Sequence, residues 1–444
     1  MININFKTEK NGISQNSDEE IYTLLQIYSD EKHNDRQRSP LNIAIALDRS
    51  GSMRGMPLDE AKLCVEMMID RLSNDDHFSL VTYDNNVDVV VPATKASNKE
   101  LLKALVRSIR SGGMTALYDG WASAAAEAAK NVTKNSISRV LLLSDGQANE
   151  GLTDENEIAS HCAQMASVGV STTTYGLSEQ FNENLMSAMA KSGKGMAHYG
   201  QTADDLADPF QSEFDLINAL IARDLKLHFI AEPGVEFEVM NKFQRNSDGS
   251  FVMSDLAEGG ELWALLKINV SKNNLNRATD GKLRILSAFI DYKNMEGEIC
   301  RSEQSHLTLD LVTDASFASL ETEELVSLRK VELEAANLQD AARVAARRHD
   351  WDEVNELVAE LDALGAENAW VKESTKKLQE YADRRETERF SKEAFYKSDR
   401  MRTRMGVMNE RASYHPEAEA LDVPSFLRRK VEFGKKSQTN SRNP

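Results

Sequence analysis

The apolar positions of residues 41–221 alternate between two spacings, which predicts alternating strands and helices. Residues 41–47 are nearly all apolar, as in a strand buried on both faces of a sheet. In residues 57–72 the apolar side chains recur with a helical period. The same alternation continues to residue 221, so we predict a doubly wound α/β domain with a mostly parallel sheet. The other expected strands are 78–83, 87–91, 139–143, 170–175 and 196–199, and the other expected helices are 99–109, 117–132, 155–168, 182–191 and 203–221.

After residue 221 the pattern changes to short apolar stretches separated by turn signals such as Asn246-Ser247-Asp248-Gly249. This predicts an antiparallel β-sandwich over residues 222–313. Residues 2–8 and 21–28 also have strand composition but no place in the parallel sheet. We therefore expect the N-terminal segment, residues 1–40, to join the sandwich. The expected sandwich strands are 225–230, 235–240, 251–253, 262–270, 283–292 and 306–312.

The chain becomes charged and helical in residues 314–404, which predicts a helical hairpin or a three-helix unit. Asp350 is the expected N-cap of one helix, with Glu353 as its return carboxylate. Gly365 marks the expected end of that helix. The alternative is a solvated helical extension without a partner. Residues 405–444 are predicted to be a flexible tail.

Composition limits the classes of function. The chain has 444 residues, enough for roughly two to four domains. Its net charge of −18 argues against a nucleic-acid-binding protein, which normally shows a basic face. Cys64, Cys162 and Cys300 are widely spaced, as expected in a reducing compartment. The polar N-terminus predicts no signal peptide, and the lack of a long apolar stretch predicts no membrane span. We therefore expect a cytoplasmic protein.

Oxygen-bearing side chains follow predicted strands at two places and precede a predicted helix at a third. Asp48, Ser50 and Ser52 alternate on a loop directly after the first strand of the α/β domain. Thr115 follows a pair of glycines just before a predicted helix, and Asp145 follows the apolar strand 139–143. In open α/β sheets, ligands bind at the carboxyl ends of the strands, near the point where the strand order reverses. A set of oxygen ligands without His or Cys suits a hard divalent cation.

These five residues resemble the metal-ion-dependent adhesion site of von Willebrand factor A domains, whose pattern is D-x-S-x-S…T…D and whose fold is Rossmann-like. The resemblance covers roughly residues 41–221. It implies bound Mg²⁺, with Mn²⁺ or Ca²⁺ as alternatives, and an open coordination position that accepts an Asp or Glu of a protein partner. Two carboxylates against a divalent ion leave the site about neutral, so it can accept that anion. A Gly/Ser loop that merely caps a helix would not account for Thr115 and Asp145.

The motif loops show no sign of catalysis. They contain no His, and Glu150 beside the Asp145 loop has the character of a solvated surface residue. Neither a G-x-x-x-x-G-K-[ST] nor an H-E-x-x-H motif is present. Metal-assisted hydrolysis needs a positioned nucleophile and usually a general base. We therefore do not expect an enzyme.

The order of an α/β domain with a flanking sandwich and then helices resembles cytoplasmic bacterial proteins, some of which resemble partners of MoxR-type AAA+ ATPases. The first hypothesis is a metal-dependent adaptor or scaffold that binds other proteins. The alternative is an accessory subunit of such an ATPase. Neither hypothesis involves nucleic acid.

The tail contains a second motif at residues 421–429, L-D-V-P-S-F-L-R-R. It resembles the C-terminal peptide of the bacterial tubulin homologue FtsZ, which implies a partner that regulates cell division. Pro424 would fix the start of a short helix, with apolar anchors and terminal charge around it. An ordinary tail helix is the alternative. The candidate docking residues are Asp422, Val423, Pro424, Phe426, Leu427, Arg428 and Arg429.

Overall fold

The computed structural model describes residues 2–29, 39–145, 148–177, 181–200, 214, 216–366, 368–403 and 406–407. Contacts divide the chain into two compact units. One unit combines Met1–Asp35 with Ala219–Pro444, and the other is Arg36–Asn218. None of the helices in the described ranges combines the length and apolar character that a membrane span requires.

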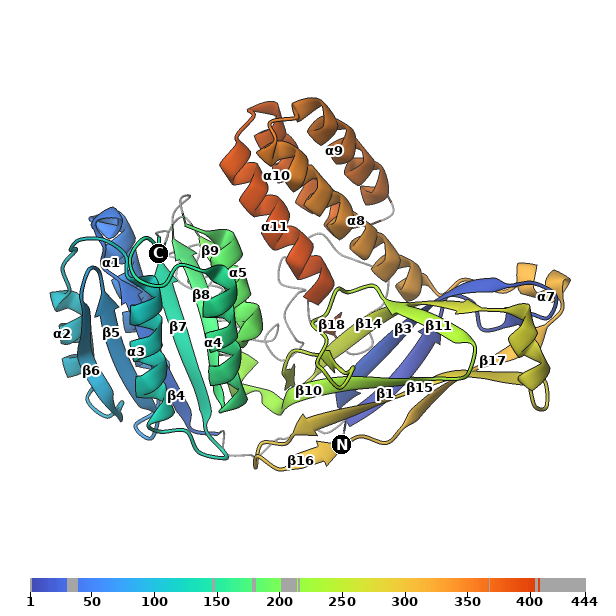
Figure 1. The fold of residues 1–444 in the computed structure, drawn as a ribbon, viewed down its shortest axis with the longest axis horizontal. Helices are drawn as coiled ribbons and strands as arrows, with labels where there is room; N and C mark the ends of the chain where they lie inside the picture. Colours follow the sequence, from blue (N-terminus) through green and yellow to red (C-terminus); the bar gives the residue numbers. More distant parts are fainter. Residues whose placement is uncertain are drawn as a thin grey trace, which may run out of the picture. The chain divides into compact units, whose positions relative to one another are not determined.

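The unit of residues 36–218 is built on a six-stranded sheet in the order β6-β5-β4-β7-β8-β9 (Figure 1). Neighbouring strands are parallel except β6, which runs antiparallel to β5. This confirms the predicted doubly wound α/β fold. The strands are β4 (Leu41–Asp48), β5 (His77–Tyr83), β6 (Val87–Lys95), β7 (Ile137–Ser144), β8 (Val170–Leu177) and β9 (Lys194–Gly200). The helices packed on them are α1 (Met56–Arg71), α2 (Lys99–Ser108), α3 (Leu117–Ala129), α4 (Glu155–Ser167) and α5 (Glu183–Ser192).

The central strands of this sheet are its most buried elements. Every residue of β4 and β7 is buried, because both strands have neighbours on each side and helices over the faces. Capping residues and a proline mark the first turns of helices that pack on this sheet. Asn98 and Asp154 cap α2 and α4 with their side-chain oxygens, and a proline stands in the first turn of α1.

The prediction of a helix over residues 203–221 was wrong at its end. Residues 214 and 216–218 are helical, whereas β10 (Leu220–Ala231) already includes the last two predicted positions. Ala222 is fully buried, and β10 pairs with β13 (Leu256–Ala257) at this point. Pairing with a distant segment therefore outweighs the local helical pattern.

The other unit contains two mainly antiparallel sheets. The first has the order β1-β3-β14-β11, with β18 added beside β14. Its strands are β1 (Ile2–Thr8), β3 (Glu19–Ser29), β14 (Gly260–Val270), β11 (Val235–Val239) and β18 (Gly406–Val407). The second has the order β12-β10-β15-β17-β2, with β13 and β16 off this path. Its further strands are β12 (Phe251–Val252), β15 (Lys282–Lys293), β16 (Ile299–Arg301), β17 (Ser305–Val312) and β2 (Ile13–Ser14).

The two sheets face each other across a shared core, so this part is a β-sandwich. Leu25 and Ile27 of β3 pack with Leu227 of β10 and Ile290 of β15. The strand β3 pairs with β14 from Glu19 to Tyr28, although about 240 residues separate the two strands in the sequence. The N-terminal strands are therefore part of the sandwich.

The helical region has more long helices than the predicted hairpin or three-helix unit. After the short α7 (Asp314–Ala318) come α8 (Glu324–Arg347), α9 (Trp351–Gly365), α10 (Ala369–Asp383) and α11 (Thr387–Thr403). Asp350 caps α9 as predicted, and its carboxylate accepts from the backbone N–H of Glu353. Among the described residues, the expected return bond from Glu353 is absent, because the Asp350 N–H donates to the Ala345 carbonyl and the Glu353 carboxylate accepts from Arg348. The charged sequence of α11 conceals an apolar stripe that includes Phe390 and Met401, both fully buried in the helical core.

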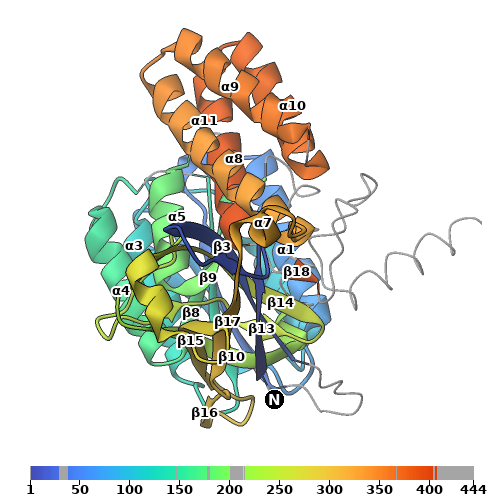
Figure 2. The ribbon, with the colours of Figure 1, turned by 90° about the vertical axis from the view of Figure 1, so that its right-hand side faces the viewer.

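The first part of helix α8 packs against one face of the first sheet, and Figure 2 shows the helical region extending from the strands. Leu325 and Val326 pack against Leu24 and Trp263 of the sheet. The Arg329 guanidinium lies 4.6 Å from the ring centre of Trp263 and pairs with Glu332 at 2.9 Å. The central strands β3 and β14 therefore have buried side chains on both faces, and this packing joins the helices to the sandwich.

Candidate metal centre

The metal motif lies where two central strands of the α/β unit end side by side. β4 and β7 are parallel neighbours, paired from Leu41 to Leu47 on one strand and from Ile137 to Leu143 on the other. Asp48 is the last residue of β4, and Asp145 directly follows β7. The chain leaves β4 for β5 on one side and returns to β7 on the other. The two carboxylates therefore lie at the point where the strand order reverses.

Hydrogen bonds connect four of the five predicted ligands. The backbone N–H of Ser50 donates to Asp48 Oδ1 at 2.8 Å, and Ser52 Oγ donates to Asp145 Oδ1 at 2.8 Å. The hydroxyls of Ser50 and Ser52 are 3.0 Å apart. Ser144 Oγ donates to the second Asp48 oxygen at 2.6 Å. The loop after β4 and the end of β7 thus bring their oxygens to one place.

The fifth residue, Thr115, reaches the site on a loop that is bonded to the Asp48 loop. The Gly112 N–H donates to the Arg49 carbonyl at 2.6 Å, and the Gly51 N–H donates to the Gly113 carbonyl at 2.8 Å. Asn149 accepts from the backbone N–H of Thr115 at 3.0 Å. Thr115 itself is 3% exposed. Backbone hydrogen bonds therefore hold the three loops of the motif together.

The turn after β5 positions the Thr115 loop, and sequence reasoning missed this support. A Cβ atom at Gly112 would lie 1.8 Å from Asp84 Oδ2, and one at Gly113 would lie 1.7 Å from Asn85 Oδ1. The Asn85 side chain also accepts from the Met114 N–H at 2.8 Å. The adjacent glycines were the only visible signal, since their partners come from another loop.

Arg49 joins the same support from inside the motif. Its guanidinium contacts Asp84 at 3.2 Å and Asp88 at 2.6 Å. Burial opposes the ionisation of Asp84, but the backbone N–H of Asn86 and the Arg49 guanidinium outweigh it, so the Asp84 pKa is lowered. Asp84 is therefore an anion paired with Arg49.

Burial has the largest effect on the pKa values of the two motif carboxyls. It raises the pKa of Asp48 to about 6, against the lowering effect of the hydrogen bonds from Ser144 and Ser50. Burial also raises the Asp145 pKa, against the hydrogen bond from Ser52. Two desolvated carboxylates beside neutral hydroxyl oxygens fit a hard divalent cation, which would supply the missing positive charge. The residues present therefore fit Mg²⁺, and Mn²⁺ or Ca²⁺ share this preference for oxygen.

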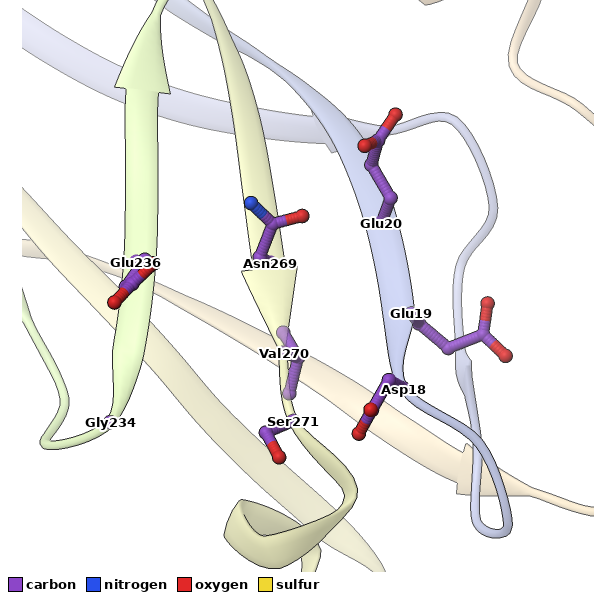
Figure 3. Close-up of a pocket in the computed structure, with 8 residues that line it drawn as sticks. All are labelled: Asp18, Glu19, Glu20, Gly234, Glu236, Asn269, Val270 and Ser271. Carbon is purple, nitrogen blue, oxygen red and sulfur yellow. The ribbon is translucent and has the colours of Figure 1, made fainter.

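An acidic pocket of about 440 Å³ at one end of the sandwich fits a cation less well (Figure 3). It is lined by Asp18, Glu19, Glu20, Gly234, Glu236, Asn269, Val270 and Ser271. Figure 3 shows the side chains of Glu19 and Glu236 pointing in different directions. Glu20 already pairs with Lys267 at 2.8 Å. In the described part of the chain, no group of three or more His, Cys, Asp or Glu side chains could hold a metal ion. The metal motif differs because hydrogen bonds join its two carboxylates to the hydroxyls and backbone of the Asp48 loop.

The second predicted site, the tail peptide, lies outside the described residues. Its candidate docking residues are Asp422, Val423, Pro424, Phe426, Leu427, Arg428 and Arg429.

Comparison with known proteins agrees with the geometry of the α/β unit. The model of the von Willebrand factor type A domain family matches residues 42–212. The uncharacterized protein sll0103 of Synechocystis is 28% identical over 182 residues, 40% of this chain and 42% of that protein. The uncharacterized protein YfbK of Escherichia coli is 26% identical over 249 residues, 54% of this chain and 43% of that protein. The inter-alpha-trypsin inhibitor heavy chain H3 of Mesocricetus auratus is 28% identical over 167 residues, 36% and 19% of the two chains. The chain spans less than half the length of these relatives.

Two solved structures share the fold beyond this domain. A von Willebrand factor type A protein from Catenulispora acidiphila aligns over 84% of this chain and 89% of its own, with a TM-score of 0.66 and 15% identity. The ArnB paralog VWA2 from Sulfolobus acidocaldarius aligns over 88% and 98%, with a TM-score of 0.58 and 15% identity. Residues 42–212 of this chain therefore form a von Willebrand factor type A domain.

Proposed function

We propose that this chain is a non-enzymatic adaptor that binds other proteins through a divalent metal ion. Domains of this family commonly mediate metal-dependent protein interactions. The observation that carries the proposal is the hydrogen-bonded set of oxygens at the ends of β4 and β7, with its two buried carboxylates. Asp48, Ser50, Ser52, Thr115 and Asp145 would hold Mg²⁺. When bound, the ion supplies a Lewis-acidic position for an Asp or Glu of the partner.

The charges of the site favour an acidic ligand. Asp48 and Asp145 together balance one divalent ion, and the remaining proposed ligands are neutral hydroxyls. The Arg49 guanidinium is neutralised by Asp84 and Asp88, so it does not compete for the partner's carboxylate. The local site is therefore about neutral when loaded, although the chain carries a net charge of −18.

The test is affinity capture from a cell lysate with the wild-type chain and Asp48→Ala, each in Mg²⁺ and in EDTA. The proposal predicts a partner that is captured only by the wild type in Mg²⁺. Partners that ignore both changes would contradict it. An AAA+ ATPase among the metal-dependent partners would favour the accessory-subunit alternative, provided that its ATPase activity changes with Asp48→Ala.

The tail sequence supports a second contact. We propose that residues 421–429 dock a cell-division regulator, because L-D-V-P-S-F-L-R-R resembles the FtsZ C-terminal peptide. This proposal rests on sequence alone. A labelled peptide of residues 418–434 should bind receptors of the FtsZ tail in fluorescence anisotropy, and a scrambled peptide should not. Equal binding of both peptides, or of neither, would remove this proposal and leave the metal site unaffected.

A further inference from the structure

Only one of the five proposed ligands is exposed. Asp48, Ser50, Thr115 and Asp145 are each at most 4% exposed, whereas Ser52 is exposed. Ser52 lies on the loop after β4, so a partner that reaches the metal past this ligand would also contact that loop. The side chains that flank this loop decide what a partner meets beside the metal.

Two exposed methionines lie close in sequence to the motif residues. Met56 begins α1, two residues after the short helix η1 (Gly51–Met53), and it is 66% exposed. Met114 immediately precedes Thr115 and is 48% exposed. The hydrogen bond from Gly51 to the Gly113 carbonyl joins the two loops that carry these methionines. An unbranched thioether side chain adapts readily to different apolar partners, so the pair provides an adaptable apolar surface.

A cation lies on the same loop. Arg54 is exposed and ends η1, where its backbone N–H donates to the Gly51 carbonyl. Within the described ranges, its side chain makes no hydrogen bond or ion pair. Arg49 differs, because Asp84 and Asp88 neutralise it. Arg54 therefore presents free positive charge beside a site that would accept a carboxylate.

We propose that Arg54, Met56 and Met114 form a specificity surface around the metal. Its occupant is a partner segment with three features: an Asp or Glu for the metal, a second acidic residue for Arg54, and an apolar side chain for the methionines. An acidic occupant would complement the charge of Arg54, which stands out in a chain whose net charge is −18. This inference rests on the proposed function and adds the class of partner.

The experiment selects peptides on the intact chain loaded with Mg²⁺. The probe is a displayed library of short peptides with one fixed central Glu and random flanks. The proteins are the wild type, Met56→Ser/Met114→Ser, Arg54→Glu and Asp48→Ala. Two matched controls lie elsewhere in the same unit. Val168→Ser removes another exposed apolar side chain, which is 59% exposed, and Lys95→Glu makes the same change of charge at another exposed cation.

The wild type and both controls should enrich an apolar residue and a second acidic residue around the fixed Glu. The double methionine variant should lose the apolar preference and bind the wild-type peptides about tenfold more weakly, as expected for a partly buried side chain. Arg54→Glu should exchange the second acidic residue for Lys or Arg.

The opposite result is that the methionine and Arg54 variants enrich the same residues around the fixed Glu as the wild type, with binding still abolished by EDTA and by Asp48→Ala. That result would overturn the proposed specificity surface and leave the metal-dependent adaptor intact. Selection of peptides that ignore both EDTA and Asp48→Ala, or of none at all, would overturn the proposed function and this inference with it.

Discussion

Replacing Asp48 by Asn should stabilise the metal-free α/β unit, although it removes a residue of the proposed site. The Asp48 carboxyl is fully buried, and burial raises its pKa from 3.8 to about 6. A raised carboxyl pKa means that the folded state disfavours the ionised form. Stability of the metal-free protein should therefore be lost as pH rises from about 4 to about 6, and the loss stays complete above that range.

The magnitude follows from the same shift. A pKa difference of roughly two units corresponds to about 3 kcal/mol at neutral pH. The amide introduced by Asp48→Asn would have no charge to desolvate. Its oxygen can still accept from the Ser50 N–H, and its NH₂ group can donate to the Ser144 hydroxyl, so contacts to both of these residues of the native site can be kept. We expect Asp48→Asn to stabilise the metal-free unit by up to about 3 kcal/mol, an upper bound because the buried amide also loses water contacts.

The assay is hydrogen exchange of peptides from β4 and β7 in EDTA, which reports the opening free energy of this unit separately from the rest of the chain. The wild type should lose protection between pH 4 and 6, and Asp48→Asn should lose less, since of the two motif carboxyls only Asp145 then has a raised pKa. Adding Mg²⁺ at about a hundred times its Kd should stabilise the wild type by about 2.7 kcal/mol and leave the variant unchanged. A variant less stable than the wild type in EDTA at neutral pH would refute this reasoning.

Three further outcomes test other parts of the structure. Apparent Mg²⁺ affinity by calorimetry should fall about tenfold per pH unit below pH 6, because protons compete for Asp48; affinity independent of pH would contradict the assigned ligand. Gly112→Ala should destabilise the unit by about 1–3 kcal/mol and weaken Mg²⁺ binding, because its Cβ would overlap Asp84; unchanged urea unfolding and calorimetry would contradict this. Arg329→Ala should lower the free energy of thermal unfolding by about 3–5 kcal/mol, because it leaves the charge of Glu332 buried without its partner. The double variant Arg329→Met with Glu332→Leu should lower it clearly less, and equal losses in both would contradict a charge effect.

The fold class could be predicted because its signals are local. The buried strands and periodic helices of residues 41–200 show in the spacing of apolar residues, and each was expected within a few positions except β6 (Val87–Lys95), which runs four residues longer. The boundary at Leu220 could not be predicted, since it depends on pairing between β10 and a strand elsewhere in the chain. In α11, charged residues obscure the apolar stripe in the sequence.

The proposed ligands could be named because the motif places them at strand ends. The residues that hold these ligands in place could not be named. Ser144, Asp84 and Asn149 bond to the motif loops from separate segments, and nothing in the local sequence marks them as partners. The glycine pair at 112–113 indicated a tight approach but did not identify Asp84 and Asn85 as the groups approached.

Isothermal titration of the full chain with Mg²⁺ tests the metal site most directly. The comparison is between the wild type, Asp48→Ala and Glu236→Ala, which removes a carboxylate from the acidic pocket of the sandwich. We predict one saturable site in the wild type that is lost in Asp48→Ala and kept in Glu236→Ala. No binding in the wild type, or identical binding in the wild type and Asp48→Ala, would contradict the metal-dependent account of this protein.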